Sequence, residues 1–229
     1  MDFTRGIKDG IPICLGYFAV SIAFGIMAVN QGLTVLEAGL ISLTNLTSAG
    51  QFAGLTIITS LGTYMELALS QLIINMRYVL MAISLSQKVD ETCQGIWRWI
   101  LGFGITDEIY AVAISQDSIS RAYFGGLMIT PIIGWTGGTV VGAILGNILP
   151  SVISNALGLA LYGMFIAIVI PDARDSLPVR IAALMAVAVS VILYYVPMFS
   201  GISGGFKIIL CTVTASTAAA LMFPREVEE

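Results

Sequence analysis

The sequence predicts an all-α, polytopic membrane protein with about eight transmembrane helices. Of its 229 residues, 57% are hydrophobic and 10% are charged, whereas a soluble domain carries about 25% charged residues. The charges are grouped between apolar stretches of roughly 20 residues, the length needed to cross a bilayer core of about 30 Å. We therefore expect one integral membrane domain over residues 1–229, in contact with the lipid bilayer, and no soluble domain.

Eight apolar segments account for the predicted spans. The N-terminal one is too long for a signal-peptide core and lacks a clear small-residue cleavage site. The second is unusually polar in its middle. The second and the fifth are candidates for broken or re-entrant segments, which would lower the count to seven. The predicted spans are Ile11–Val29, Ala38–Ile58, Met65–Leu85, Ile96–Ile114, Tyr123–Leu145, Val152–Ile170, Val179–Val196 and Phe206–Phe223.

Basic residues in the short loops predict that both termini are cytoplasmic, in a bacterial inner membrane. With eight spans and an internal N-terminus, the inner side holds more basic residues than the outer side, as the positive-inside rule requires. The inner ones are Arg5, Lys8, Arg121, Arg174, Arg180 and Arg225, and the outer ones are Lys88 and Arg98, with Lys207 near the last helix start.

Two pairs of similar segments suggest an internal repeat. LGYFAVSIAFGIMAVNQ (15–31) and LGFGITDEIYAVAISQD (101–117) both open with Leu-Gly-aromatic, and SAGQFAG and TGGTVVG both carry glycines four apart. Three spans per repeat would invert the second repeat relative to the first, a common design in secondary transporters. The predicted repeats are 11–86 and 97–171, followed by two C-terminal helices. Chance similarity between hydrophobic segments is the alternative.

Arg77 lies near the centre of the third predicted span. A charge at that depth costs at least about 2.5–3.5 kcal/mol on insertion scales, so the guanidinium must face the protein interior or water. The only acidic residues near the middle of any predicted span are Asp107 and Glu108. Their pairing with Arg77 is either a structural ion pair or a substrate and proton site. The second interpretation is favoured because intramembrane charges are usually functional.

Helical geometry separates Arg77 from the neighbouring Asn75. On an ideal helix Asn75 shares a face with Gln71 and Tyr78, whereas Arg77 lies about 200° away. The two side chains therefore face one cavity only if the helix is unwound between them. Either Arg77 serves a different neighbour or the third span is broken, and the sequence leaves both alternatives open.

The second predicted span holds many hydrogen-bonding side chains, among them Asn45, Ser48 and Gln51, and Gly50 interrupts its pattern. A discontinuous helix there would free backbone groups to bind a carboxylate or an ammonium. Tight helix packing is the alternative. The fifth span predicts close packing against a helix of this chain or of a partner subunit, and a homo-oligomer is compatible with this. Its glycine stripe is Gly134, Gly138, Gly142 and Gly146.

The composition argues against several function classes. No histidine is present, which removes the commonest metal ligand and the usual neutral-pH base. The three cysteines are far apart and imply neither a metal site nor a disulfide framework. No basic patch suggests nucleic acid, and no ATP-binding or cofactor motif occurs. An intramembrane protease would need a second catalytic aspartate or a base, so an enzyme is not expected.

Four short motifs occur in a familiar order: AFG (23–25), SAGQF (48–52), INMRYVLM (74–81) and TDE (106–108). In this order and at these distances they resemble the AzlC family, the large subunits of bacterial branched-chain amino acid exporters, and the resemblance covers essentially the whole chain. It implies export of leucine, isoleucine and valine, with methionine as a further candidate, and a small AzlD-like membrane subunit as partner. Tyr78 stands where many relatives have histidine, so no histidine role in proton coupling carries over.

The resulting hypothesis is a secondary transporter driven by an ion gradient or by the substrate gradient. Arg77, or backbone N–H groups near Gly50, would hold the substrate carboxylate, and Asp107 or Glu108 would hold the ammonium and carry a coupling proton. A passive channel for a small polar solute and a structural subunit of a transport complex are the alternatives. The predicted substrate-binding residues are Asn45, Ser48, Gly50, Gln51, Asn75, Arg77 and Thr106, and the predicted proton-coupling residues are Asp107 and Glu108. Of these, Gln51, Asn75, Arg77, Thr106, Asp107 and Glu108 match the family motifs.

Overall fold

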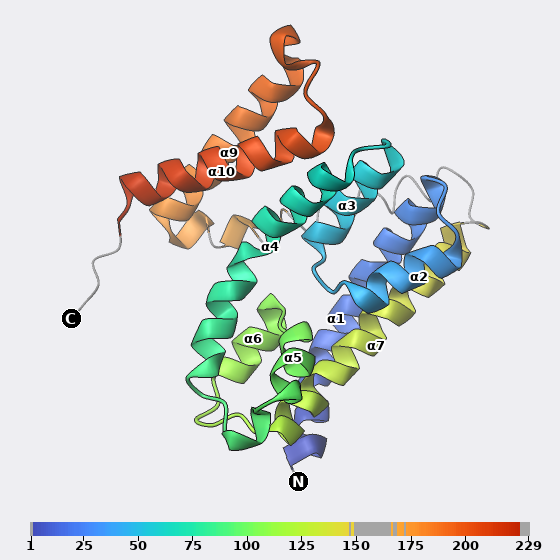
Figure 1. Cartoon of the computed structure of the whole chain (residues 1–229), viewed down its shortest axis with the longest axis vertical. Helices are drawn as coiled ribbons and strands as arrows, with labels where there is room; N and C mark the ends of the chain where they lie inside the picture. Colours follow the sequence, from blue (N-terminus) through green and yellow to red (C-terminus); the bar gives the residue numbers. More distant parts are fainter. Residues whose placement is uncertain (1, 147, 149–165, 167–168, 172, 225–229) are drawn as a thin grey trace. The chain divides into compact units, whose positions relative to one another are not determined.

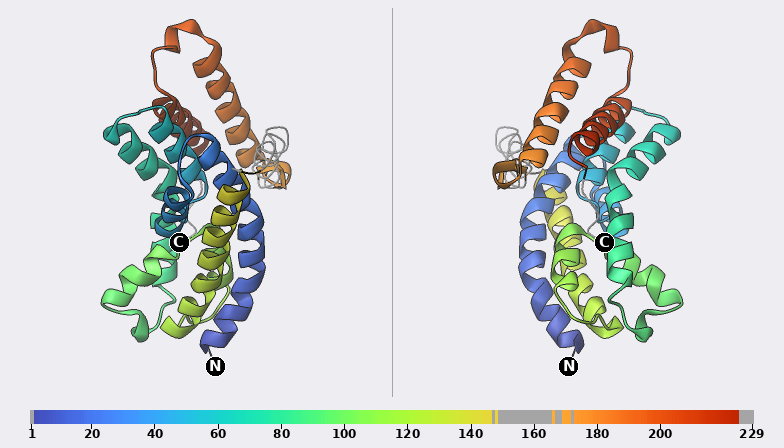
Figure 2. Two further views of the ribbon diagram at one scale, coloured as in Figure 1. Left: turned by 90° about the vertical axis from the view of Figure 1, so that its right-hand side faces the viewer. Right: turned by 90° about the vertical axis from the view of Figure 1, so that its left-hand side faces the viewer.

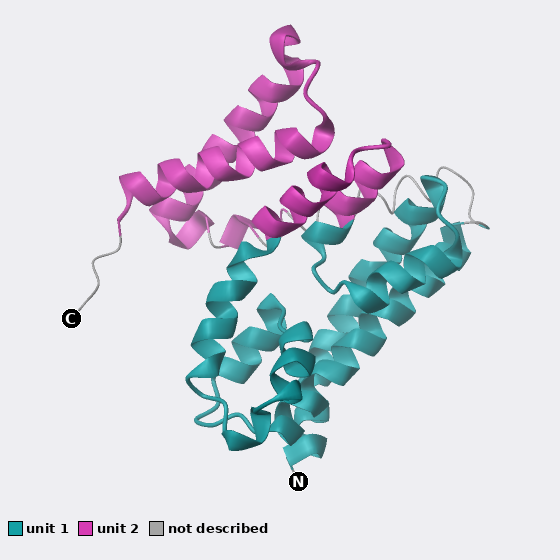
Figure 3. Cartoon of the chain, in the orientation of Figure 1, with its two compact units in different colours: residues 1–51, 75–161 teal, residues 52–74, 162–229 magenta. Residues whose placement is uncertain are grey.

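The computed structural model describes residues 2–146, 148, 166, 169–171 and 173–224 (Figure 1). The chain forms two compact units: unit 1 comprises residues 1–51 and 75–161, and unit 2 comprises residues 52–74 and 162–229 (Figure 3). The prediction of an all-α polytopic membrane protein is confirmed, because five of the described helices are long and apolar enough to cross a membrane. The sixth predicted span, Val152–Ile170, and Arg225 lie largely or wholly outside the described residues.

The long helices agree with five predicted spans, whereas the second and fourth predicted spans are each two short helices. The third span is one unbroken helix, and so is the fifth despite Pro131, so the fifth is not broken as the sequence allowed. The long helices are α1 (Asp2–Asn30), α4 (Tyr64–Ser86), α7 (Arg121–Gly146), α9 (Leu177–Tyr195) and α10 (Gly204–Met222). The short ones are α2 (Val35–Thr44), α3 (Ala49–Thr59), α5 (Ile96–Phe103) and α6 (Asp107–Ile114), with single 3-10 turns at η1 (Glu91–Cys93) and η2 (Pro197–Phe199).

The core of unit 1 is a close, parallel pair formed by α1 and α7, which lie side by side in both views of Figure 2. A Cβ at Gly138 would overlap the backbone of Phe18, and one at Gly142 would overlap the backbone of Ile22. Only glycine permits this approach of two backbones, so the glycine stripe of α7 packs against a helix of the same chain. Both helices begin at the same end of unit 1, which we call the N-terminal face.

The second predicted span is interrupted between Asn45 and Ser48. The side chain of Asn45 accepts a hydrogen bond from the backbone N–H of Thr47 at 3.2 Å, and Ser48 has a φ of +46°, in the left-handed region. A side chain that bonds its own backbone in this way competes with the helical ladder. The expected discontinuity is therefore present, but it lies before Gly50, which is inside α3.

The fourth predicted span, Ile96–Ile114, is also interrupted, and its prediction as one continuous helix is wrong. Gly104 ends α5, and Thr106 starts α6 by accepting a hydrogen bond from the backbone N–H of Ile109 at 3.4 Å. Two acidic residues follow in the first turn of α6, where the helix dipole favours negative charge.

The pair α5–α6 is re-entrant, because both of its ends lie on the N-terminal face. The backbone N–H of Ile119 donates to the carbonyl of Lys88 at 2.9 Å, and the N–H of Asp90 donates to the carbonyl of Ile119 at 3.0 Å. The ammonium of Lys88 also donates to the carbonyls of Ile114 and Gln116, at 2.7 and 3.0 Å. A helix of eight residues spans about 12 Å, less than half of the bilayer core, so α5 enters and α6 returns.

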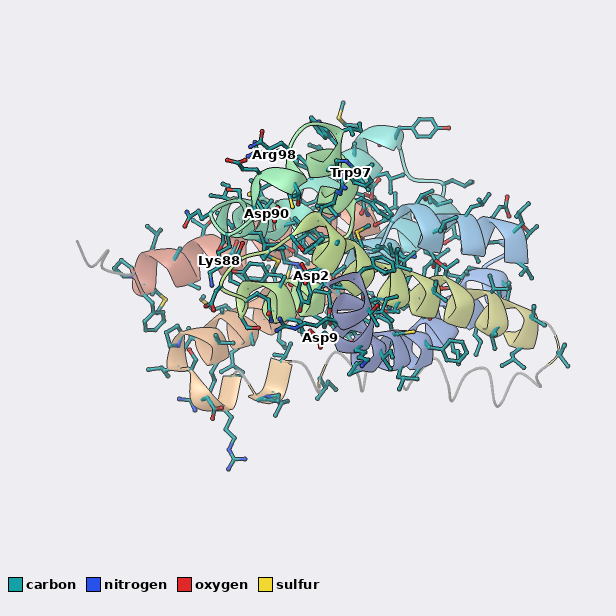
Figure 4. All side chains as sticks on the ribbon, turned by 90° about the horizontal axis from the view of Figure 1, so that it is seen from below. Asp2, Asp9, Lys88, Asp90, Trp97 and Arg98 are labelled. Atoms are coloured by element: carbon teal, nitrogen blue, oxygen red, sulfur yellow. The ribbon has the colours of Figure 1, made fainter. Side chains whose placement is uncertain are left out.

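This geometry corrects the predicted positions of Lys88 and Arg98. The sequence placed both on the outer side because it counted the second segment, which the structure divides into α2 and α3, as a full crossing between α1 and α4. Figure 4 instead shows Lys88 and Arg98 at the end of unit 1 that also carries Asp2 and Asp9. The N-terminal face thus carries five basic residues, namely Arg5, Lys8, Lys88, Arg98 and Arg121.

Cysteine labelling should verify this topology. In a background without native cysteines, Gln87→Cys and Asp117→Cys are expected to react with a membrane-impermeant maleimide from the same side as Phe3→Cys, because hydrogen bonds join the loops that flank α5–α6 to each other. Gln31→Cys, just beyond the end of α1, is the control and should react from the opposite side. Labelling of positions 87 and 117 from opposite sides would show that the segment between them crosses the membrane, and would contradict the re-entrant arrangement.

Unit 2 contains a buried carboxylate that the sequence analysis did not single out. Glu66, in the first turn of α4, is 3% exposed. Its Oε1 accepts a hydrogen bond from the hydroxyl of Ser203 and another from the backbone N–H of Gly205 at 2.8 Å. The carboxylate therefore caps the N-terminus of α10, which packs against α9, and a negative charge is favourable at that helix end.

Candidate functional site

The candidate site lies in unit 1, at the turn where α5 ends and α6 begins. We call the pair α5–α6 the hairpin and this turn the hairpin tip. Thr106, Asp107 and Glu108 begin α6 there. The length of α5 places this tip about 12 Å from the N-terminal face. Arg77 lies nine residues before the end of α4, which corresponds to about 13 Å. Acids and arginine are therefore at matching depths, close to the centre of a bilayer core of about 30 Å.

Arg77 and Asp107 form an ion pair, with Nη2 of Arg77 2.9 Å from Oδ2 of Asp107. The guanidinium also lies over the Tyr78 ring, 5.1 Å from its centroid. The two charged side chains remain 44% and 41% exposed. A pair that is this open in water contributes little to stability. At membrane depth the attraction is stronger, and the exposed part must face water or another polar surface.

The unbroken α4 decides between the two alternatives for Arg77. Because the helix continues from Tyr64 to Ser86, Arg77 and Asn75 point in different directions. Arg77 therefore serves Asp107 rather than sharing a cavity with Asn75. A second contact joins α4 to the hairpin closer to the N-terminal face. There the hydroxyl of Tyr110 donates a hydrogen bond to the hydroxyl of Ser84 at 3.1 Å.

Tyr17, in the middle of α1, holds the other residues at the start of α6. Its hydroxyl lies 2.7 Å from Oγ1 of Thr106 and forms a short hydrogen bond with Oε2 of Glu108. Thr106 is 2% exposed. The carboxyl of Glu108 is thus oriented by a phenol, whereas that of Asp107 is oriented by a guanidinium. Two adjacent acids have different partners, which suits different roles in one site.

A buried polar network extends from Tyr17 to the break between α2 and α3. The rings of Tyr17 and Trp135 meet edge to face with centroids 5.3 Å apart. Trp135 donates from Nε1 to Oε1 of Gln51 at 2.6 Å, and Gln51 donates from Nε2 to Ser42 at 2.9 Å. Ser42 is in turn 2.7 Å from Thr139. Because all four members of the network beyond Tyr17 are at most 1% exposed, Gln51 is held within the protein interior rather than at an open surface.

The structure thus brings some of the predicted site residues together and separates others. Arg77, Thr106, Asp107 and Glu108 meet at the hairpin tip. Asn45, Ser48 and Gly50 lie at or beside the break between α2 and α3, and Asn75 lies on another face of α4. Gln51 reaches the tip only through Trp135 and Tyr17. Substrate binding and proton coupling by these residues remain predictions.

Four residues that contribute to this arrangement were not among the predicted site residues: Tyr17, Ser42, Trp135 and Thr139. A signal for two of them was available, because a buried Tyr or Trp usually has a hydrogen-bond partner for its polar atom. Among the residues that the structure describes, no three His, Cys, Asp or Glu side chains are grouped so that they could hold a metal ion.

Comparison with known proteins adds independent information on the family. The sequence profile described as "AzlC protein" matches residues 12–149, which include every predicted site residue. An Escherichia coli (strain K12) protein named "Inner membrane protein YgaZ" is 29% identical over 207 residues, covering 86% of this chain and 84% of that protein. An "Uncharacterized membrane protein" of Archaeoglobus fulgidus is 27% identical over 174 residues, covering 75% and 76%. No solved structure matches the chain.

Proposed function

Because the chain belongs to the AzlC family, we propose that it is a secondary transporter that exports leucine, isoleucine and valine across a bacterial inner membrane. The observation that carries the proposal is the Arg77–Asp107 ion pair, which is half-exposed at mid-membrane depth. Charged residues at such depth are costly and mark substrate or ion pathways. A half-helix that begins at the same point is the usual setting for a substrate carboxylate or ammonium in secondary transporters.

Substrate binding exchanges one ion pair for two. A zwitterionic amino acid presents its carboxylate to Arg77 and its ammonium to Asp107, so neither protein charge is left without a partner. The exchange adds no net charge to the site, which matters because an uncompensated charge in a low-dielectric environment is strongly unfavourable. An amino acid with a charged side chain would break this balance, and the site would therefore favour amino acids with uncharged side chains.

Glu108 is the better candidate for the coupling proton, because Asp107 is engaged by Arg77. The hydroxyl of Tyr17 donates to ionised Glu108. When Glu108 is protonated it becomes a donor itself, and the hydrogen bond with Tyr17 must rearrange. Proton transfer at Glu108 would thereby move the contact between α6 and α1. The five basic residues of the N-terminal face favour a cytoplasmic location for that face, with a small AzlD-like subunit completing the transporter.

Counterflow in proteoliposomes tests this function. Liposomes loaded with unlabelled leucine and containing the protein, with and without an AzlD-like subunit, are expected to accumulate labelled leucine. Isoleucine and valine should compete, whereas lysine and glutamate should not. Tyr17→Phe keeps the ring that contacts Trp135 but removes the hydroxyl from Glu108, so transport should become slower and less dependent on pH, as with Glu108→Gln.

Tyr64→Phe is the matched control for the loss of a phenol, since Tyr64 is 93% exposed; it should transport as the parent does. Labelled leucine that enters down its own gradient at the same rate with and without an imposed proton gradient, and that shows no counterflow, would favour a passive channel instead. An absence of counterflow for all three branched-chain amino acids, with the small subunit present, would exclude the proposed substrates.

A further inference from the structure

A cavity of about 210 Å³ lies in unit 1 between the last turns of α4 and the re-entrant helix α5. Its walls are mostly aliphatic and aromatic: Leu85 of α4, Leu101 of α5, Ile105 in the turn between α5 and α6, and Phe124 of α7. Leu85, Leu101 and Phe124 are themselves largely buried, so the walls are held in place by the packing of unit 1. A water molecule occupies about 30 Å³ in the liquid, and the cavity has room for the side chain of a leucine or an isoleucine.

Arg98 is the one charged residue that lines this cavity. It belongs to the first turn of α5 and lies at the N-terminal face, near Trp97 in Figure 4. The lining residue Cys93 is not a second charge, because burial raises the pKa of its thiol. The cavity therefore combines apolar walls with a single cation at one end, which is complementary to a molecule with an apolar body and an anionic group.

At its other end the cavity reaches the turn between α5 and α6. Ile105 lines the cavity, and the next residue is Thr106, which hydrogen-bonds to Tyr17 at the hairpin tip. The cavity thus extends along α5 from the N-terminal face as far as the residue that precedes the start of α6. A phospholipid acyl chain is several times longer than an aliphatic amino acid side chain, and the side chain is the better match for a cavity of about 210 Å³.

We propose that this cavity is a loading site for the exported amino acid, in which the aliphatic side chain packs against Leu85, Leu101 and Phe124 and the carboxylate pairs with Arg98. The proposal rests on the proposed transport function. From this loading site the amino acid moves along α5 to the ion pair at the tip. Selection for an aliphatic side chain occurs here, in the apolar cavity, whereas the ion pair recognises the two charges common to all neutral amino acids.

Gly102→Leu tests the loading site by filling it. Gly102 lines the cavity, and a Cβ at this position meets nothing within 4 Å, so a leucine side chain can enter the cavity without displacing backbone. The variant is expected to raise the half-saturation concentration for leucine about tenfold or more, and that for alanine less, since even one methylene in a fitted pocket changes discrimination about tenfold or more. Gly16→Leu is the control, because Gly16 lies on α1 with equally open surroundings.

Arg98 provides a second, independent variant. Arg98→Gln is expected to raise the half-saturation concentration for leucine and alanine alike, because both carry the carboxylate, and Arg98→Lys should restore part of the loss. Thermal unfolding of each purified variant in detergent shows that it is folded.

The outcomes separate this proposal from the proposed function. Leucine transport by the parent protein with an unchanged preference for leucine over alanine in Gly102→Leu would overturn the loading site and leave the function standing. A parent protein that transports no amino acid would overturn both. Loss of co-purified phospholipid from Gly102→Leu and Arg98→Gln, with unchanged substrate preference, would assign the cavity to a lipid.

Discussion

Replacing Arg77 alone with glutamine is expected to destabilise the protein more than replacing Arg77 and Asp107 together. The single variant leaves Asp107 without its partner at mid-membrane depth, and a lone charge there costs about 2.5–3.5 kcal/mol on insertion scales. Arg77→Gln combined with Asp107→Asn removes both charges and leaves two groups that can hydrogen-bond to each other. We expect a lower thermal unfolding midpoint in detergent and less protein in the membrane for the single variant, and recovery for the double variant.

Transport separates the functional role of this pair from a structural one. If Arg77 and Asp107 hold the two ends of a substrate, the double variant folds but does not transport leucine. A double variant that transports as well as the parent would show that the pair only joins α4 to α6. Arg5→Gln is a matched control: Arg5 pairs with Asp9 at 3.9 Å with 65% of its side chain exposed, and its loss should change stability by no more than about 1 kcal/mol.

Gly138→Ala is expected to separate α1 from α7. A Cβ at this position would overlap the Ser21 hydroxyl, which can rotate away, and the Phe18 backbone, which cannot move without shifting α1. Overpacking a close contact costs about 1–3 kcal/mol, and here the obstacle is backbone rather than a flexible side chain. The thermal unfolding midpoint should fall sharply, and counterflow should fall with it, because α1 carries Tyr17 and α7 carries Trp135.

The neighbouring glycine makes the control. A Cβ at Gly137 would lie 3.9 Å from the Phe18 ring, an ordinary van der Waals distance. Gly137→Ala should therefore be neutral or raise stability by up to about 1 kcal/mol, the helix-propensity difference between glycine and alanine. Equal effects of Gly137→Ala and Gly138→Ala on the unfolding midpoint would contradict the close parallel packing of the two helices.

The sequence was sufficient to predict the helical membrane class and the shared depth of Arg77 and Asp107. It was not sufficient to predict how the segment from Ile96 to Ile114 is folded. A largely apolar segment of 19 residues has the length of one crossing helix, and hydropathy does not distinguish that helix from two short helices joined at a turn. Local chemistry did carry the information: Gly104 disfavours a helix interior, and a threonine followed by two acids is a typical helix start.

The buried polar network could not be predicted from the sequence, and the reason is different. Trp135 and Gln51 are 84 positions apart, and nothing local in either segment indicates that they meet. Their hydrogen bond depends on the α1–α7 contact and on the exact place where α2 ends. The same holds for the cavity beside α5, because it is formed by α4, α5 and α7 together and has no counterpart in any single stretch of sequence.

The parallel course of α1 and α7 determines on which side of the bilayer residue 146 lies relative to the N-terminal face. Both start on the N-terminal face, and the single 23-residue helix α4 ends there, so the polypeptide traverses the membrane three times before residue 146, where five traverses had been inferred. Both three and five are odd numbers of traverses. The end of α7 therefore lies on the same side of the bilayer under either count, so the locations of residues 2 and 146 alone could not distinguish three traverses from five.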